Sequence, residues 1–223
     1  MHPGGSRSGD WIRVERLEPA RSREAGGVLA ASHADYPAFR HLFARRTVRQ
    51  RVLRPFMAAT ARDAALHGHA LVARDDLGVL GVALWMPPGA SRLSARRKAA
   101  MTPALVRAAV RAPRWFPAFM RVGAALENAH PAEAAWYLEA MGVHPRAQRR
   151  GVGSRLITPV LTLADESGLP CYLQTSDPAN IEYYRRYGFE VSQPSIETIP
   201  DGPRYIGMTR PASARHPGTG KPA

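Results

Sequence analysis

The hydrophobic positions in the first half of the chain predict strands, helices and a hairpin. The elements are a strand at residues 11–17, helices at 19–31, 36–43 and 47–67, and a hairpin formed by 69–73 and 79–86. Within 47–67 the apolar residues recur at helical spacing with arginines on the other faces. Pro55 predicts that this helix breaks or starts afresh in its middle. The Asp-Asp-Leu-Gly sequence before Val79 supplies the turn chemistry of the hairpin.

The second half of the chain predicts a helical segment followed by alternating strands and helices. Residues 89–135 carry mostly helical signals and predict two helices. After them come strands at 136–143, 171–175, 189–192 and 204–209, with helices at 151–166 and 178–187. A hairpin followed by strands joined through crossover helices predicts an α/β fold with a mixed sheet of about six or seven strands and helices on both faces. We expect a single domain over residues 11–210.

The two ends of the chain differ from this domain in composition. Residues 1–10 and 211–223 are rich in Gly, Pro, Ser and charge, which predicts disordered tails. No run of apolar residues is long enough for a spanning helix or a signal peptide, and the one cysteine, Cys171, cannot form an internal disulfide. These features predict a cytoplasmic protein without membrane association, and no Cys/His spacing indicates a metal site.

The formal net charge of +13 raises the question of an anionic partner. The positive charge is almost entirely arginine, and the arginines are spread along the chain rather than gathered in one block. This distribution argues against specific nucleic-acid binding.

A polar loop with two glycines precedes the helix predicted at 151–166. It reads Gln148-Arg149-Arg150-Gly151-Val152-Gly153 and is followed by Ser154. Free backbone N–H groups at a helix N-terminus suit a pyrophosphate, glycines permit close approach, and the two arginines add charge. Any tight turn into a helix could show two glycines, so the loop alone does not decide. A dinucleotide-binding fingerprint lacks its third glycine here, and a P-loop lacks its Gly-Lys-Ser/Thr.

A second motif, Asn180-Ile-Glu-Tyr-Tyr184-Arg-Arg-Tyr-Gly188-Phe189, makes the pattern specific. The order of strand, Gln-x-x-Gly-x-Gly, helix, strand, Asn, Tyr and Gly-Phe resembles the GNAT superfamily of N-acetyltransferases, and implies its fold. Further matches resemble the puromycin N-acetyltransferase-like enzymes of actinobacteria, namely Trp136-Tyr-Leu, Gly142-Val-His-Pro, Gln174-Thr-Ser, Gly202-Pro-Arg and His33-Ala-Asp-Tyr-Pro37. Residues 89–130 match poorly. Gln174 stands where these relatives carry a glutamate, so no carboxylate role is carried over to it.

The resemblance implies acetyl-CoA as cofactor. The strand at 136–143 should splay from the strand at 171–175, and its free backbone groups should pair with the pantetheine arm, which Asn180 also holds. The implied cofactor-binding residues are Met141, Gly142, Val143, Gln148, Arg149, Arg150, Gly151, Val152, Gly153, Ser154, Thr175, Asn180 and Tyr184.

Two residues are candidates for the chemistry. Tyr184 is placed to protonate or hydrogen-bond the departing thiolate, and the alternative is a packing aromatic beside Tyr183. Because a thiolate is the weaker base, full proton transfer from tyrosine is uphill by about 2 kcal/mol. Glu139 is the first candidate for the base, since strand alternation places it on the face of Met141 and Val143 and apolar neighbours would raise its pKa. An ion pair with an arginine is the alternative for Glu139, and His144 is a second candidate base.

The acceptor side is less defined. Asp35 and Tyr36 are candidate substrate-binding residues by resemblance, and a helix cap followed by an ordinary aromatic is the alternative. The 89–135 segment is expected on this side. The prediction is an enzyme that acetylates a primary amine of a small molecule, such as an antibiotic in a resistance function, or a metabolite. A protein N-terminal or lysine acetyltransferase, and a non-catalytic acyl-CoA-binding or nucleic-acid-binding domain, are the alternatives. The resemblance also implies a homodimer.

Overall fold

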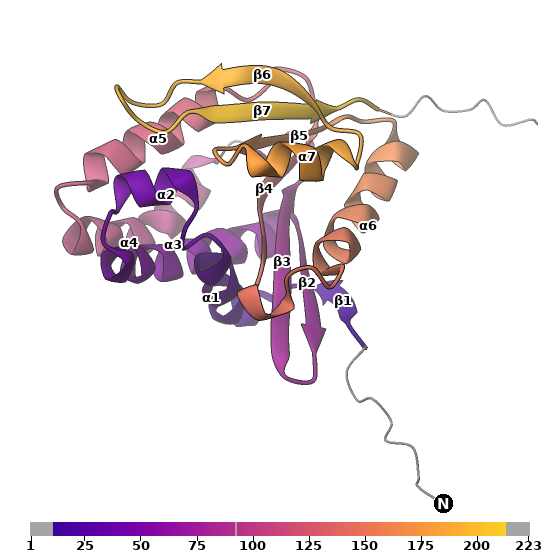
Figure 1. Cartoon of the computed structure of the whole chain (residues 1–223), viewed down its shortest axis with the longest axis horizontal. Helices are drawn as coiled ribbons and strands as arrows, with labels where there is room; N and C mark the ends of the chain where they lie inside the picture. Colours follow the sequence, from indigo (N-terminus) through magenta and orange to yellow (C-terminus); the bar gives the residue numbers. More distant parts are fainter. Residues whose placement is uncertain (1–10, 92, 213–223) are drawn as a thin grey trace, which may run out of the picture.

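A single mixed sheet organises the computed structural model, which describes residues 11–91 and 93–212 (Figure 1). Its strand order is β1-β2-β3-β4-β5-β7-β6, and every neighbouring pair is antiparallel except β4 with β5. The strands are β1 Arg13–Arg16, β2 His69–Asp75, β3 Gly78–Met86, β4 Trp136–Val143, β5 Cys171–Thr175, β6 Glu190–Ile196 and β7 Tyr205–Arg210. The predicted mixed sheet and its strand number are confirmed.

The helices largely follow the predicted ranges. They are α1 Ser22–Ser32, α2 Pro37–Leu42, α3 Arg46–His67, α4 Ala95–Arg111, α5 Phe116–Asn128, α6 Val152–Ser167 and α7 Ala179–Arg185, with 3-10 turns at Pro19–Arg21 and Pro145–Ala147. The predicted break at Pro55 is wrong, because α3 runs through it. Proline removes one backbone donor, and the buried Leu53 and Met57 on either side of it hold the helix against the core.

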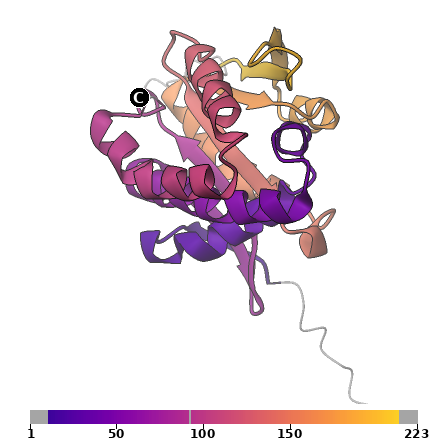
Figure 2. The ribbon, with the colours of Figure 1, turned by 90° about the vertical axis from the view of Figure 1, so that its left-hand side faces the viewer.

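The helices cover both faces of the sheet. On one face α6 and α7 pack through Leu156, Val160 and Tyr184 against β3 and β4. On the other face α1 and α3 pack against the same strands, and α2, α4 and α5 extend this layer over β7 and β6 (Figure 2). Gly26 allows α1 and α3 to approach closely, since a Cβ there would lie 2.4 Å from the Ala58 nitrogen.

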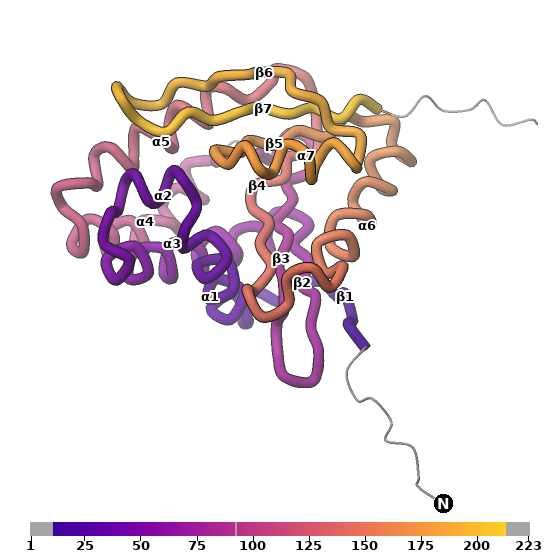
Figure 3. Tube along the Cα trace, in the orientation of Figure 1, coloured from indigo at the N-terminus to yellow at the C-terminus, as the bar shows by residue number. Residues whose placement is uncertain are grey.

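The crossover between the two parallel strands leads the chain past the predicted cofactor loop. Figure 3 traces β4 to its end, around the loop and back along α6 to β5. The loop therefore meets the N-terminus of α6 beside the end of β4, as the sequence predicts. The predicted tail at 1–10, and all of the predicted tail at 211–223 except its first two residues, lie outside the described residues. No described helix combines the length and apolarity that a membrane crossing needs.

Candidate active site

The parallel strands β4 and β5 separate partway along their length. They pair only at Trp136 with Cys171, Tyr137 with Tyr172 and Leu138 with Leu173, although β4 continues to Val143. On its other side β4 stays paired with β3 as far as Val143. The predicted splay is thus confirmed, and the last part of β4 has a strand edge without a β5 partner, where backbone groups of a ligand can pair.

A β-bulge at Glu139 changes which way the residues of β4 face. Leu138 pairs with Trp85 and Ala140 with Leu84, so one extra residue is inserted between them. Met141 and Val143 pack on the α6 face, whereas the charges that act on Glu139 are those of Asp63 and Arg97 in α3 and α4. The prediction that Glu139 shares a face with Met141 and Val143 is therefore wrong, because simple alternation does not survive a bulge.

One carboxyl oxygen of Glu139 is buried without a hydrogen-bond partner. Its Oε2 contacts no hydrogen-bond donor among the described residues. The pKa of Glu139 is raised to about 7. Burial is the main cause, the charge of Asp63 adds to it, and Arg97 opposes both. The predicted upward shift of the pKa is confirmed in direction. A carboxyl group with a pKa near neutrality can accept and release protons at physiological pH.

The loop before α6 presents backbone groups and arginines to the outside. Gly151 is the N-cap of α6 with a φ of 74°, a left-handed conformation that favours glycine, and a Cβ there would meet nothing within 4 Å. Gln148, Arg149 and Arg150 are exposed, and the first N–H groups of the helix have no partner within it. This open, positively charged helix N-terminus fits an anionic diphosphate.

Gly153 has a packing role that the sequence does not reveal. A Cβ at this position would lie 2.4 Å from the hydroxyl oxygen of Tyr183 in α7. The glycine therefore admits a tyrosine, and the neighbouring Ser154 and Tyr187 hydroxyls lie 2.7 Å apart. These contacts dock α7 against the start of α6.

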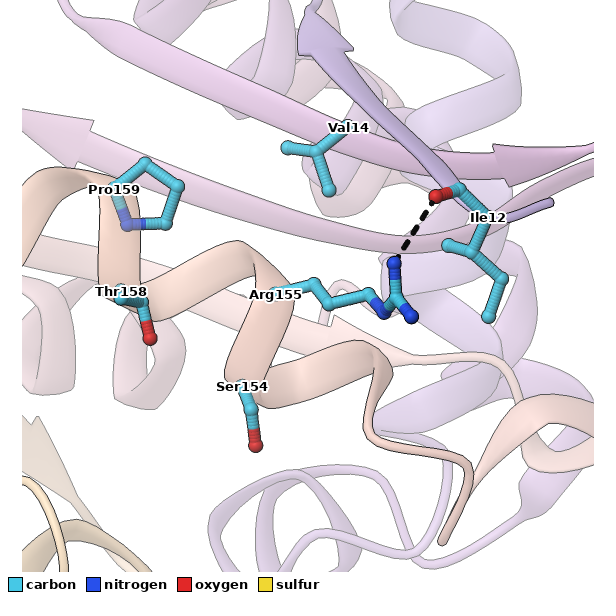
Figure 4. A pocket seen from close by; sticks show the side chains of 6 residues that line it. All are labelled: Ile12, Val14, Ser154, Arg155, Thr158 and Pro159. Carbon is cyan, nitrogen blue, oxygen red and sulfur yellow. Dashed lines mark hydrogen bonds between the residues drawn. The ribbon is translucent and has the colours of Figure 1, made fainter. Parts of the chain in front are cut away.

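The side of α6 that faces β1 contains a shallow apolar hollow (Figure 4). Its lining includes Ile12, Val14 and Pro159, and Arg155 reaches across it, donating from Nη1 to the Ile12 carbonyl at 3.4 Å. This hydrogen bond links Arg155 to the residue that precedes β1. The arginines that belong to the loop itself are Arg149 and Arg150.

The end of β5 is a junction of hydroxyl groups. Thr175 Oγ1 accepts from Asn180 Nδ2 at 3.0 Å and lies 2.8 Å from the Tyr36 hydroxyl. The Tyr36 hydroxyl also accepts from the Ser176 N–H at 2.7 Å. Tyr36, Thr175 and Asn180 are thus brought together where the splay opens, although they come from distant parts of the chain.

Asp35 is separated from its neighbour Tyr36. Its side chain is 69% exposed and pairs with the buried Arg49 at 3.3 Å. Arg49 also donates to the carbonyls of Ala34 and Phe43, so this ion pair belongs to the connection that leads into α2 and α3. Asp35 therefore holds a loop, while Tyr36 turns into the site.

Tyr184 lies in the core beneath the splay. It is buried, and its ring contacts Tyr183 and Phe189 edge to face. Burial, with a smaller contribution from Tyr36, raises its pKa well above the usual value for tyrosine. Tyr184 is therefore protonated at neutral pH. His144, the other candidate base, caps the 3-10 turn after β4 by accepting at Nδ1 from the Arg146 N–H.

The sequence did not predict a buried ion pair, nor the hydrogen bonds by which one amide side chain links two elements. Arg97 donates to both carboxylate oxygens of Asp63, the single acidic residue of α3. A lone carboxylate in an arginine-rich helix was the available signal. Gln174 donates to the Leu126 carbonyl and the Tyr172 hydroxyl, so it links β5 to α5. Among the described residues, no three His, Cys, Asp or Glu side chains gather as metal ligands would.

Comparison with known proteins identifies relatives of this arrangement. The model of the acetyltransferase (GNAT) family matches residues 37–189, more than half of the chain. A protein of Schizosaccharomyces pombe described as an uncharacterized N-acetyltransferase is 37% identical over 59 residues. That match covers 26% of this chain and 24% of the relative, so the chain spans about a quarter of the curated relative it matches.

Two solved structures share the fold over nearly their whole length. One, from Corynebacterium glutamicum, is described as histone acetyltransferase HPA2 and related acetyltransferase. It has a TM-score of 0.64 at 22% identity, and the match covers 92% of this chain and 98% of the other. The other is arylalkylamine N-acetyltransferase 2 of Aedes aegypti, with a TM-score of 0.54 at 13% identity and coverage of 91% and 99%. At these identities the likeness concerns the fold alone.

Proposed function

The chain belongs to the acetyltransferase (GNAT) family, and from this premise we propose that it is an N-acetyltransferase that moves an acetyl group from acetyl-CoA to a primary amine of a small molecule. The observation that carries the proposal is Glu139, whose buried oxygen has no partner beside the open edge of β4. A catalytic base for an amine needs such a group, and a packing residue does not.

The residues around the splay fit acetyl-CoA. The N-terminus of α6 at Gly151 would hold the diphosphate, together with Arg149 and Arg150, and the free edge of β4 from Met141 to Val143 would pair with the amides of the pantetheine arm. Asn180 and Thr175 would orient the arm from the end of β5. When bound, acetyl-CoA supplies the acetyl group as an activated thioester.

Glu139 is the base in this proposal. It takes the proton of the acceptor ammonium, and its pKa of about 7 leaves much of it ionised at neutral pH and still basic. The amine nitrogen loses a second proton as its bond to the acetyl carbon forms and the C–S bond breaks. This second proton passes to the sulfur, and the proton held by Glu139 is released to solvent when the acetylated acceptor leaves.

Tyr184 is the hydrogen-bond donor to the leaving sulfur. A tyrosine with its usual pKa is already a weaker acid than a thiol, and burial raises the pKa of Tyr184 further. Full proton transfer from it is therefore more unfavourable than the sequence suggests. Tyr184 can instead keep its proton and donate a hydrogen bond to the charged or partly charged sulfur. This role requires no proton transfer.

The acceptor in this proposal is a small amine. The candidates are puromycin-like antibiotics and metabolic amines. If the acceptor is an antibiotic, its acetylation would confer resistance. Tyr36, which resembles the puromycin-enzyme group in sequence, lies within the site. A histone-like tail is a poorer acceptor, because a lysine-rich peptide would be repelled by a protein of net charge +13. The proposed assembly is a homodimer, which light scattering would test.

The proposal is tested by calorimetry and thiol release. Acetyl-CoA should bind, and puromycin or other small amines should cause release of free thiol. Glu139→Gln should slow this release by about 10²- to 10³-fold without loss of acetyl-CoA binding. No binding of acetyl-CoA would refute the proposal. Binding of acetyl-CoA with thiol release only toward peptides would move the acceptor to proteins. Salt-sensitive binding of nucleic acid in place of acetyl-CoA would favour the non-catalytic alternative.

A further inference from the structure

Beside the proposed base lies a buried ion pair that joins α3 to α4. Arg97 Nε lies 3.0 and 3.1 Å from the two carboxylate oxygens of Asp63, and Nη2 lies 2.5 Å from one of them. The side chains of both residues are only 8% exposed. A carboxylate saturated in this way by a guanidinium has little capacity left for another cation.

Arg97 is fixed from two further directions. Its Nη1 donates to the Ala90 carbonyl at 2.6 Å, and its backbone N–H donates to Ser94, the N-cap of α4. Ala90 packs on the same hydrophobic cluster as Tyr137 and Ala140. These two residues of β4 flank the bulge at Glu139. The ion pair and Glu139 therefore belong to one face of the sheet.

Asp63, Arg97 and Glu139 together carry one net negative charge when all three are ionised. When Glu139 is ionised, Asp63 and Arg97 cancel each other and one carboxylate remains uncompensated. One ammonium ion completes the balance at Glu139, whose Oε2 has no protein partner. A second ammonium in this buried site would find no carboxylate left to compensate its charge, and burying an unpaired charge is costly.

The segment that runs from β3 through α4 adds no further acid. Residues 77–126, which include α4 and most of α5, contain no Asp or Glu. Their charged side chains are all positive, namely Arg92, Arg96, Arg97, Lys98, Arg107, Arg111, Arg114 and Arg121. A second cation on the acceptor would therefore meet only positive charge from this segment.

We propose that Arg97 restricts the acceptor to monoamines with an uncharged body, because by holding Asp63 in a buried ion pair it leaves Glu139 as the one carboxylate that can receive an ammonium. The proposal rests on the proposed function, in which Glu139 receives the acceptor amine. Arg97 acts here as a specificity-determining residue because it occupies the carboxylate that a second cation would need.

The test compares two amines of equal chain length, n-pentylamine and 1,5-diaminopentane. Rates of thiol release with acetyl-CoA are measured for the wild type, Arg97→Ala, Asp63→Asn/Arg97→Ala and, as a matched control, the exposed neighbour Arg96→Ala. The wild type and Arg96→Ala should prefer pentylamine by at least about tenfold in kcat/KM, in keeping with the cost of burying a charge without a partner. Arg97→Ala should lose that preference by freeing Asp63, and the double variant should regain it.

A second measurement needs no turnover. The melting temperature of each protein is recorded with either amine. Diaminopentane should raise the melting temperature of Arg97→Ala more than pentylamine does, and should have no such advantage with the wild type or the double variant. If Arg97→Ala does not fold, Arg97→Gln, which keeps donors for Asp63, replaces it.

The outcomes separate the specificity from the function. A wild type that uses or binds both amines equally, or an Arg97 variant with an unchanged preference, overturns the role of Arg97. Absence of thiol release with every amine refutes the proposed function, and the melting temperatures then decide the charge specificity by themselves. Equal melting shifts in all variants would overturn it.

Discussion

The cofactor side and the acceptor side of the proposed active site are built in different ways. The cofactor side consists of the loop at 148–153, the free edge of β4 and the end of β5, and it works largely through backbone groups from one stretch of chain. The acceptor side depends on the charged side chains of Asp63, Arg97 and Glu139, which come from three elements. Substitutions on the two sides should therefore separate binding of the cofactor from the chemistry.

The largest effect is expected on the acceptor side. Glu139→Gln keeps the shape of the side chain and removes the base, so kcat/KM for the amine should fall by about 10²- to 10³-fold, as is usual for loss of a general base. The affinity for acetyl-CoA, measured by calorimetry, should stay unchanged.

Glu133→Gln is the matched control for Glu139→Gln, because Glu133 is an exposed glutamate just before β4. It should leave both activity and binding at the wild-type level. A fully active Glu139→Gln enzyme would show that ordered water takes the proton. Substitutions on the acceptor side would then no longer separate the chemistry from cofactor binding.

The next largest effect is expected from Tyr184→Phe, because the proposed leaving sulfur lies where the cofactor side meets the acceptor side. Loss of a hydrogen bond to a charged atom costs about 1.5 to 3 kcal/mol, which corresponds to a kcat lowered about 10- to 100-fold. Since the proposed bond strengthens as the sulfur leaves, kcat should fall while the affinity for acetyl-CoA, measured by calorimetry, is retained. An equal loss of cofactor affinity would instead mark Tyr184 as a packing residue.

The difference between the two sides also explains what could be predicted from the sequence. The ranges of β4 and β5, the loop and the helix after it were predictable because each is a local pattern of apolar residues, glycines and polar residues. The continuous α3 across Pro55 was not, because tertiary packing on both sides of the proline outweighs its local preference.

The orientation of Glu139 and its surroundings could not be predicted for a different reason. Leu138 and Ala140 are both apolar, so the sequence carries no sign that a bulge inserts one residue between them. The ion pair of Asp63 and Arg97 joins two helices separated by a hairpin, and only folding brings them together. Side-chain constellations of this kind are invisible to local periodicity.

A smaller effect is expected on the cofactor side from Gly153→Ala. The new methyl group would press on the Tyr183 hydroxyl and displace the start of α6 from α7. Overpacking of this kind costs about 1 to 2 kcal/mol, so the Kd for acetyl-CoA should rise by about tenfold. The melting temperature should also fall, and kcat at saturating acetyl-CoA should change little.

The added variant Tyr183→Phe sharpens this prediction. In Gly153→Ala/Tyr183→Phe the hydroxyl that the methyl group meets is gone, so much of the affinity should return. Gly27→Ala is the control, because a Cβ at Gly27 meets nothing within 4 Å. If the double variant binds acetyl-CoA as weakly as Gly153→Ala, the glycine is needed for the ligand itself.

The smallest effect is a shift of pH dependence on the acceptor side. Burial is the main cause of the raised pKa of Glu139, and the charge of Asp63 adds to it. Activity requires ionised Glu139, so it should rise with pH through a pKa of about 7. Asp63→Asn removes a negative charge and leaves the charge of Arg97 unopposed. Both changes favour the ionised carboxylate, so the acidic limb of kcat/KM against pH should move to lower pH. Asp76→Asn, on the exposed turn between β2 and β3, is the control and should leave the acidic limb in place. If the limb moves to higher pH in Asp63→Asn, Asp63 acts on Glu139 through structure rather than through its charge.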